Sequence, residues 1–187
     1  MRKKVSRIIS LSVLALALIA VIMALRAPSA TPVPVSSQDA KSFDEKILSL
    51  EQAHQQGLTK TAHITEAELS SKLQQSLEES AANPQGSVVL KAASVHLEGD
   101  GFVGLFTLSV SGKELYLTMT GKLAALDGTL QIEPSTGKLG RLPIPAPVFR
   151  SLLEKQFNSP AGRERLRLPE LIKDVRIENG ELLVEAK

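Results

Sequence analysis

Residues Ser87 to Leu123 read SVVLKAASVHLEGDGFVGLFTLSVSGKELYLTMTGKL and contain three apolar runs, separated by the turn signals GDG and SGK. Such signals join neighbouring strands through tight hairpins. Apolar side chains alternate with polar ones in the second and third runs, which gives each strand one packed face and one wetter face. The alternating residues are Phe102, Phe106, Leu108 and Val110, followed by Leu115, Leu117, Met119 and Leu123. The sequence therefore predicts an antiparallel meander.

The last residues, DVRIENGELLVEAK from Asp174 to Lys187, predict a separate hairpin. Asn179-Gly180 is the pair best suited to the positive backbone angles of a type I′ turn. A two-residue loop at this pair places four apolar side chains on one face: Val175 opposite Val184, and Ile177 opposite Leu182. Because the turn chemistry and the hydrophobic pattern agree, the hairpin is a strong prediction.

The segment after the meander predicts another strand and then an abrupt stop. LDGTLQIE, at residues 126–133, adds a turn and a short strand, which PSTG at residues 134–137 is expected to close. Pro143 and Pro145 remove hydrogen-bond donors, so the strand through Leu139 and Leu142 must end or run along a sheet edge.

A helix is expected directly after these prolines. Pro147 suits a first helical turn, and an apolar stripe follows it until Pro160 and Gly162: Phe149, Leu152, Leu153 and Phe157. This helix can form one wall of an apolar groove, with Arg141 or Arg150 at its mouth to meet a phosphate. The alternative is that the prolines form a rigid corner and that the stripe is ordinary core.

Two capping boxes predict helices ahead of the meander. SFDE at Ser42 to Glu45 and TEAE at Thr65 to Glu68 each place a hydroxyl and a carboxylate where they can satisfy free backbone amides. The first helix has Phe43, Ile47 and Leu50 on one face and Gly57 as its stop; the second has Leu69, Leu73 and Leu77, and ends at Asn83-Pro84. Both narrow apolar faces are expected to lie on the sheet.

The chain begins with a segment typical of a membrane anchor. Four basic residues precede an uncharged, apolar run from Ile8 to Leu25, and 18 helical residues span about 27 Å, close to the thickness of the bilayer core. Since Arg26 is the one basic residue that follows closely, the positive-inside rule predicts a cytoplasmic N-terminus and an extracytoplasmic remainder. A cleaved signal peptide is the alternative. Residues 31–41 are expected to be a linker.

Charge is distributed unevenly along the chain. Residues 31–137 carry 7 basic and 13 acidic residues, whereas residues 138–176 carry 9 basic and 4 acidic residues. In an extended conformation Arg163, Arg165 and Arg167 share one side, where they can face anionic lipid headgroups or a protein partner. The alternative is a solvated face paired with nearby acidic residues.

Motifs for catalysis or cofactor binding are not evident. His54, His63 and His96 have no metal-ligand spacing, and the chain has no cysteine, which excludes disulfides and thiolate ligands. We find no nucleophile elbow, phosphate loop or dinucleotide fingerprint. Because the chain has no Trp, it offers few aromatic side chains on which nucleic-acid bases could stack. The sequence favours a non-enzyme without cofactor, metal or nucleic-acid partner, with an undetected hydrolase as a minor alternative.

Three segments carry a resemblance to a known family: ITEAELSSKLQQSL, KLGRLPIPAPVFRSLLEKQF and RLPELIKDVRIENGELLVE. Over roughly residues 64–185 the chain resembles the YpmS-like membrane-anchored envelope proteins and, more distantly, LmeA-like proteins and the tubular lipid-binding (TULIP-like) modules. Ser70 stands where such helices often carry Asn. The resemblance implies a curved antiparallel sheet that holds helices and an apolar groove for acyl chains, in a bacterial cell envelope.

These inferences combine into one expectation. We expect an α+β protein with an N-terminal transmembrane helix (residues 1–30 with its cytoplasmic stub), a linker (31–41) and one extracytoplasmic domain (42–187). That domain is expected to hold a curved antiparallel sheet, made of the meander and the C-terminal hairpin, and two or three amphipathic helices. Its expected function is to bind or present a lipid or lipid-like envelope component, and the alternative is a scaffold in an envelope complex. The candidate ligand-binding residues are Arg141, Phe149, Arg150, Leu152 and Phe157; the candidate membrane or partner surface is Arg163, Arg165 and Arg167.

Overall fold

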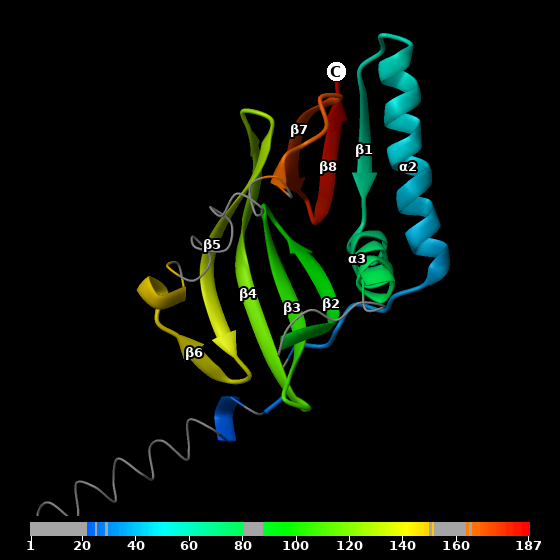
Figure 1. The fold of residues 1–187 in the computed structure, drawn as a ribbon. Coiled ribbons are helices and arrows are strands. Elements are labelled where there is room, and N and C mark those ends of the chain that lie inside the picture. The colour runs from blue at the N-terminus through cyan, green and yellow to red at the C-terminus, as the bar shows by residue number, and fades with distance from the viewer. Residues whose placement is uncertain are drawn as a thin grey trace, which may run out of the picture.

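The chain is an α+β protein with an antiparallel sheet, as the sequence predicts, and among the residues that the structure describes this sheet has eight strands (Figure 1). The computed structural model describes residues 22–24, 26–28, 30–80, 88–149, 151, 164 and 166–187. Its elements are α2 (Ser37–Gln55), β1 (Lys60–Ile64), α3 (Glu66–Ser80), β2 (Val88–Glu98), β3 (Gly101–Val110), β4 (Lys113–Leu126), β5 (Thr129–Leu139), β6 (Leu142–Ile144), β7 (Ile172–Glu178) and β8 (Glu181–Ala186). The strand order is β1-β8-β7-β4-β3-β2, and β5 pairs with β4 and β6.

The meander forms as predicted, as β2, β3 and β4. Each hairpin has a two-residue loop, and the loop between β3 and β4 has positive φ at both Ser111 and Gly112. The register pairs Phe106 with Leu117 and Leu108 with Leu115. Paired residues of antiparallel strands point to the same side, so the two apolar sets share one face of the sheet.

The prediction that PSTG closes β5 is wrong, because β5 continues through it to Leu139. The register shifts by one residue here: Pro134 pairs with Gly121 and Thr136 with Thr120, which leaves Ser135 as the extra residue of a β-bulge. A side chain at Gly121 would lie 2.6 Å from the carbonyl oxygen of Glu133, so glycine permits the close approach of the two backbones. The bulge accommodates a turn-like sequence without ending the strand.

The C-terminal hairpin is confirmed, with its predicted register. Val175 pairs with Val184 and Ile177 with Leu182, around a loop whose two residues both have positive φ. This hairpin joins the sheet next to the beginning of β3, where Arg176 pairs with Ala124 of β4. Strand β4 therefore contacts β3, β5 and β7.

Strand β1 was not predicted from the sequence. Its five residues, KTAHI, lie between the two helices and pair with β8, with Ala62 and Ile64 buried. Two apolar residues in five give little periodicity, so the sequence carries no clear strand signal here. The pairing makes β1 one end of the described strand order.

Helix α2 begins earlier than predicted. Ser36, not Ser42, is the N-cap, and its hydroxyl accepts a hydrogen bond from the Asp39 amide at 3.1 Å. SSQD and SFDE both place a serine three residues before an acid, and the earlier one forms the cap. The expected linker thus contributes its last residues to α2. Val33 is buried, and the Thr31 carbonyl lies 2.8 Å from Nε2 of His96. We call residues 30–36 the strap, because they lie against the sheet.

Helix α3 has the predicted capping box. The Thr65 amide donates to the Glu68 carboxylate at 2.8 Å, and the Glu68 amide donates to the Thr65 hydroxyl at 3.3 Å. The predicted stop at Asn83-Pro84 lies outside the described residues. The apolar faces of both helices contact the core through Phe43, Ile47 and Leu50 and through Leu69 and Leu73.

Side chains of α3 also satisfy the backbone of β2, the last strand in the described order. Ser70 is fully buried, and its hydroxyl accepts from the Val95 amide at 2.9 Å and donates to the Val95 carbonyl at 3.2 Å. Glu66 accepts from the Leu97 amide at 3.2 Å. The helix therefore closes this edge of the sheet in the way that another strand would.

Glu68 is buried and connects the two helices. It accepts hydrogen bonds from Lys46 at 2.7 Å and from the Ser42 hydroxyl, besides the amide of Thr65. Burial alone would raise the pKa of Glu68, but the hydrogen bonds from Lys46, Ser42 and Thr65 and the charge of Lys46 outweigh it and lower that pKa to about 2.

Ser70→Ala should destabilise the protein by about 1–3 kcal/mol, because it leaves both backbone groups of Val95 buried without a partner. The measurement is the free energy of unfolding from urea denaturation. Ser37→Ala, at an exposed position of α2, is the control and should change stability by less than about 0.5 kcal/mol. Equal effects of the two substitutions would contradict the edge-closing role of Ser70.

The lowered pKa of Glu68 predicts acid sensitivity. A carboxylate with a depressed folded-state pKa stabilises the protein fully above its unfolded-state pKa, near 4.3, and loses that contribution as the pH falls toward about 2. The contribution is about 3 kcal/mol at neutral pH. Glu68→Gln should flatten the dependence of unfolding free energy on pH in this window, and Lys46→Met should move the acid loss to higher pH. A wild-type slope in Glu68→Gln would exclude this account.

Candidate functional site

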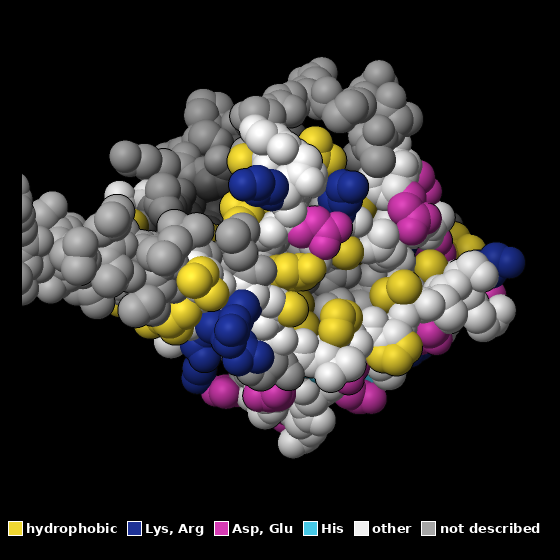
Figure 2. All heavy atoms as spheres, turned by 90° about the horizontal axis from the view of Figure 1, so that it is seen from below, with side chains coloured by type: hydrophobic (Ala, Val, Ile, Leu, Met, Phe, Trp, Pro, Cys, Tyr) yellow, Lys and Arg dark blue, Asp and Glu magenta, His cyan; other side chains and the backbone are white. Residues whose placement is uncertain are grey.

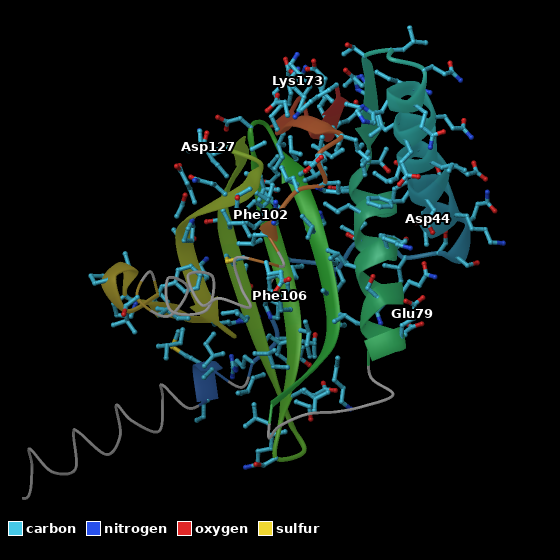
Figure 3. All side chains as sticks on the ribbon, turned by 45° about the horizontal axis from the view of Figure 1, so that its top comes forward. Asp44, Glu79, Phe102, Phe106, Asp127 and Lys173 are labelled. Carbon is cyan, nitrogen blue, oxygen red and sulfur yellow. The ribbon has the colours of Figure 1, made fainter. Side chains whose placement is uncertain are left out.

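One face of the sheet is apolar across four neighbouring strands, and it is the candidate site. Phe106 of β3 pairs with Leu117 of β4, which pairs with Leu139 of β5, which pairs with Leu142 of β6. These side chains form a continuous row. The same side, which we call the apolar face, holds Phe102, Leu108, Leu115, Met119, Leu123, Leu130, Ile132 and Ile144. Phe102 and Phe106 lie in the middle of the sheet on β3 (Figure 3).

On this face, two aromatic rings occupy the space next to two glycines, where a larger side chain would otherwise lie. A side chain at Gly104 would lie 2.7 Å from the ring of Phe106, and one at Gly137 would lie 2.5 Å from the ring of Phe149. Phe149 comes from the short helical turn at residues 146–149, where its amide donates to the Pro145 carbonyl at 3.0 Å. The proline corner therefore turns the chain back over the apolar face.

The apolar face is buried at one end and half-buried at the other. Phe102 and Met119 belong to the core, at 6% and 7% exposure. Toward the β3–β4 and β5–β6 turns, four leucines are half-buried and lie outside the core cluster: Leu108, Leu115, Leu139 and Leu142. The view from below shows apolar side chains around a hollow, with Lys and Arg side chains beside it (Figure 2).

The predicted ligand-binding residues are only in part described. Phe149 is 3% exposed and packs on Gly137, so its described contacts are those of a core residue. Arg141 is exposed in the β5–β6 turn. Arg150, Leu152 and Phe157 lie outside the residues whose side chains are described, and so do Arg163 and Arg165.

Arg141 contacts the end of the predicted anchor. Its amide donates to the Met23 carbonyl at 2.8 Å, and its Nε donates to the Ala27 carbonyl at 3.4 Å. The neighbouring Gly140 lies so close that a side chain there would come within 2.4 Å of the Ala24 carbonyl oxygen. The β5–β6 turn is thus in contact with the end of the N-terminal apolar segment. Sequence alone gave no signal for this contact, because the two parts are more than a hundred residues apart.

Arg167 lies at the opposite end of β5. It pairs with Thr129, at the start of the strand, and the adjacent Leu168 donates to the Gly128 carbonyl at 2.9 Å. Eleven strand residues span about 36 Å, so the structure separates Arg167 from Arg141. An open pocket of about 600 Å³ beside Arg167 is lined largely by polar and charged residues, including Asp127, Glu164, Glu170 and Lys187. Figure 3 labels Asp127 at this end.

A second depression lies on the other face of the sheet, beside Pro28 and Ala30. It has a volume of about 440 Å³, and its lining includes Thr118, Thr120 and Thr136 together with Lys138 and Arg141. The hydroxyls of Thr120 and Thr136 are 2.6 Å apart and hydrogen-bonded to each other. Hydroxyl donors beside two basic side chains can hold an anionic group at the surface.

The histidines support the fold and form no metal site among the residues that the structure describes. His63 lies 2.9 Å from Glu181 across the β1–β8 pair, at an exposed position. His96 contacts the strap through Thr31, as described above, and lies 3.5 Å from Glu66. His54 contacts the Lys187 carbonyl at 3.0 Å. Each ring connects two segments that are distant in sequence.

Comparisons with family models, curated proteins and solved structures yield no match to this chain. The described helices include none that is long and apolar enough to cross a membrane. Most of the predicted anchor, up to residue 21, lies outside the described residues.

Gly137→Ala should destabilise the protein by about 1–3 kcal/mol, because the new methyl group overlaps the Phe149 ring and forces a shift in a packed site. Phe149→Leu should cost a similar amount. The double substitution should cost clearly less than the sum of the two, since the smaller side chain makes room for the methyl group. Urea denaturation of the four proteins gives this coupling, and strict additivity would contradict the contact.

Proposed function

We propose that this protein is a membrane-anchored, extracytoplasmic domain that binds or presents a lipid or lipid-like component of the cell envelope, without catalysis. The observation that carries the proposal is the apolar face, because its leucine-rich end remains half-buried among the described residues. A surface of this kind in a soluble domain marks a place where an apolar ligand or partner binds.

An acyl chain matches this end of the sheet. Leu108, Leu115, Leu139 and Leu142 come from four different strands and present aliphatic side chains without polar groups between them in the paired rows. Covering apolar surface contributes about 25 cal/mol per Å², and the contribution needs no directional contact. A curved sheet around such a ligand, as in the tubular lipid-binding modules that the sequence resembles, belongs to this proposal.

The N-terminal segment supports an envelope location. The run from Ile8 to Leu25 is long enough to span a bilayer, and the basic residues before it favour a cytoplasmic N-terminus. Met23 and Ala27 contact the β5–β6 turn, next to Leu139 and Leu142. The open end of the apolar face would then lie on the membrane side, where lipid ligands are found.

A scaffold role is the second candidate, favoured by the Arg167 region. Its charged pocket lies at the end of β5 far from the anchor contact and carries both acidic and basic side chains. A surface there would be accessible to a protein partner rather than to the bilayer.

The lipid proposal predicts co-purified lipid. Residues 30–187, which retain the strap and every described strand, are purified without detergent and measured by native mass spectrometry, followed by lipid extraction. We expect near one phospholipid per chain, and we expect Leu115→Arg to reduce its occupancy about tenfold or more, because a buried unpaired charge is costly against an acyl chain.

Leu48→Arg is the matched control. Leu48 is 52% exposed on α2, away from the apolar face, so the bound lipid should persist. Circular dichroism of each variant reports whether the fold is retained. A folded wild-type protein that carries no lipid, and takes up none from phospholipid vesicles, would contradict lipid binding and favour the scaffold.

A further inference from the structure

The β5–β6 turn holds the end of the N-terminal segment by its backbone. Met23 accepts from the Arg141 amide as well as, at 3.4 Å, from the Arg26 amide. The first helical residues described, 22–24, therefore lie against the turn, where the Met23 carbonyl finds a partner. The turn therefore holds Met23 and Ala27 against the domain.

An exposed apolar corner lies close to this contact. Pro145, Ala146, Pro147 and Val148 are all exposed, and Val148 has 52% of its surface accessible. Only β6, about 10 Å long, separates this corner from Arg141. The fold itself does not bury these side chains among the described residues, although Phe149, the next residue, is in the core.

Basic side chains surround the same region. Arg26, Lys138 and Arg141 are exposed, and no acidic residue is among the described residues that line the depression between Lys138 and Arg141. Apolar side chains at a corner with basic residues beside them are the composition of a surface that rests in a membrane interface.

We propose that Arg26, Lys138, Arg141 and Pro145 to Val148 form a bilayer-docking surface, which holds the domain on anionic lipids of the membrane that contains its own anchor. This proposal rests on the membrane anchor of the proposed function. Docking places Leu139 and Leu142 beside the headgroups, so that an acyl chain can pass between bilayer and apolar face without crossing water. The basic side chains contact phosphate, and the Pro-Ala-Pro-Val corner enters the acyl boundary.

The absence of cysteine from the chain allows a direct test. The full chain is reconstituted into nanodiscs that contain phosphatidylcholine with phosphatidylglycerol, and a single environment-sensitive fluorophore is attached through Val148→Cys. The matched control is Leu126→Cys, since Leu126 is 53% exposed but lies at the β4–β5 turn, the far end of β5. Nitroxide-labelled lipids then quench any probe that lies in the interface.

We expect strong quenching and a blue-shifted emission for Val148→Cys, and neither for Leu126→Cys. Adding Lys138→Glu and Arg141→Glu, or replacing phosphatidylglycerol by phosphatidylcholine, should reduce the quenching about twofold or more, because the electrostatic attraction is lost.

Each contrary outcome has a separate meaning. Equal quenching of the two probes, or none in a chain that is stably held in the disc, overturns docking, whereas co-purified lipid in residues 30–187 would still support the ligand. A chain that does not enter the disc overturns docking together with the anchor. If neither the glutamate substitutions nor the change of lipid alters the quenching of Val148→Cys, the basic residues have no role in docking. The proposal of docking on anionic lipids is then overturned.

Discussion

Strand β4 has two edges but must supply hydrogen-bond partners to three strands. It solves this by its length: β3 uses one edge up to Gly121, and β7 meets the same edge further on, at Ala124, while β5 pairs with the other edge from Leu117 to Leu126. The tips of the two hairpins meet, since Gly180 donates to the Gly99 carbonyl at 3.4 Å. Both the meander and the C-terminal hairpin depend on this one strand, so the packing of the helices depends on it as well.

Local signals predicted most of this sheet. Ser111-Gly112 and Asn179-Gly180 form the turns that their sequences favour, and period-two alternation correctly gave the side chains that share a face in β3, β4, β7 and β8. The misjudged places are those where tertiary contacts decide between local options. Ser36 and Ser42 are equivalent caps in sequence, but Ser42 instead hydrogen-bonds Glu68 of the other helix. The five residues of β1 become a strand because β8 offers them an edge.

The candidate site was predicted in outline and not in its geometry. The apolar parity of the meander indicated which side chains would share a face, and the prolines indicated a corner. No sequence pattern could show that Phe149 would fill the space above Gly137, or that Arg141 would contact the segment around Met23. Ser70 gives a similar lesson, because its hydroxyl both accepts from and donates to the backbone of Val95, on a strand more than twenty residues away in the sequence.

The extra residue at Ser135 divides β5 into two halves of opposite phase. Before it, even-numbered residues such as Leu130 and Ile132 lie on the apolar face; after it, odd-numbered residues such as Leu139 do. Length changes in this strand are therefore not equivalent. Loss of one residue between the bulge and Leu139 would move the Leu139 side chain to the face that Lys138 now occupies. Loss of two residues would shorten the strand but keep Leu139 on the apolar face.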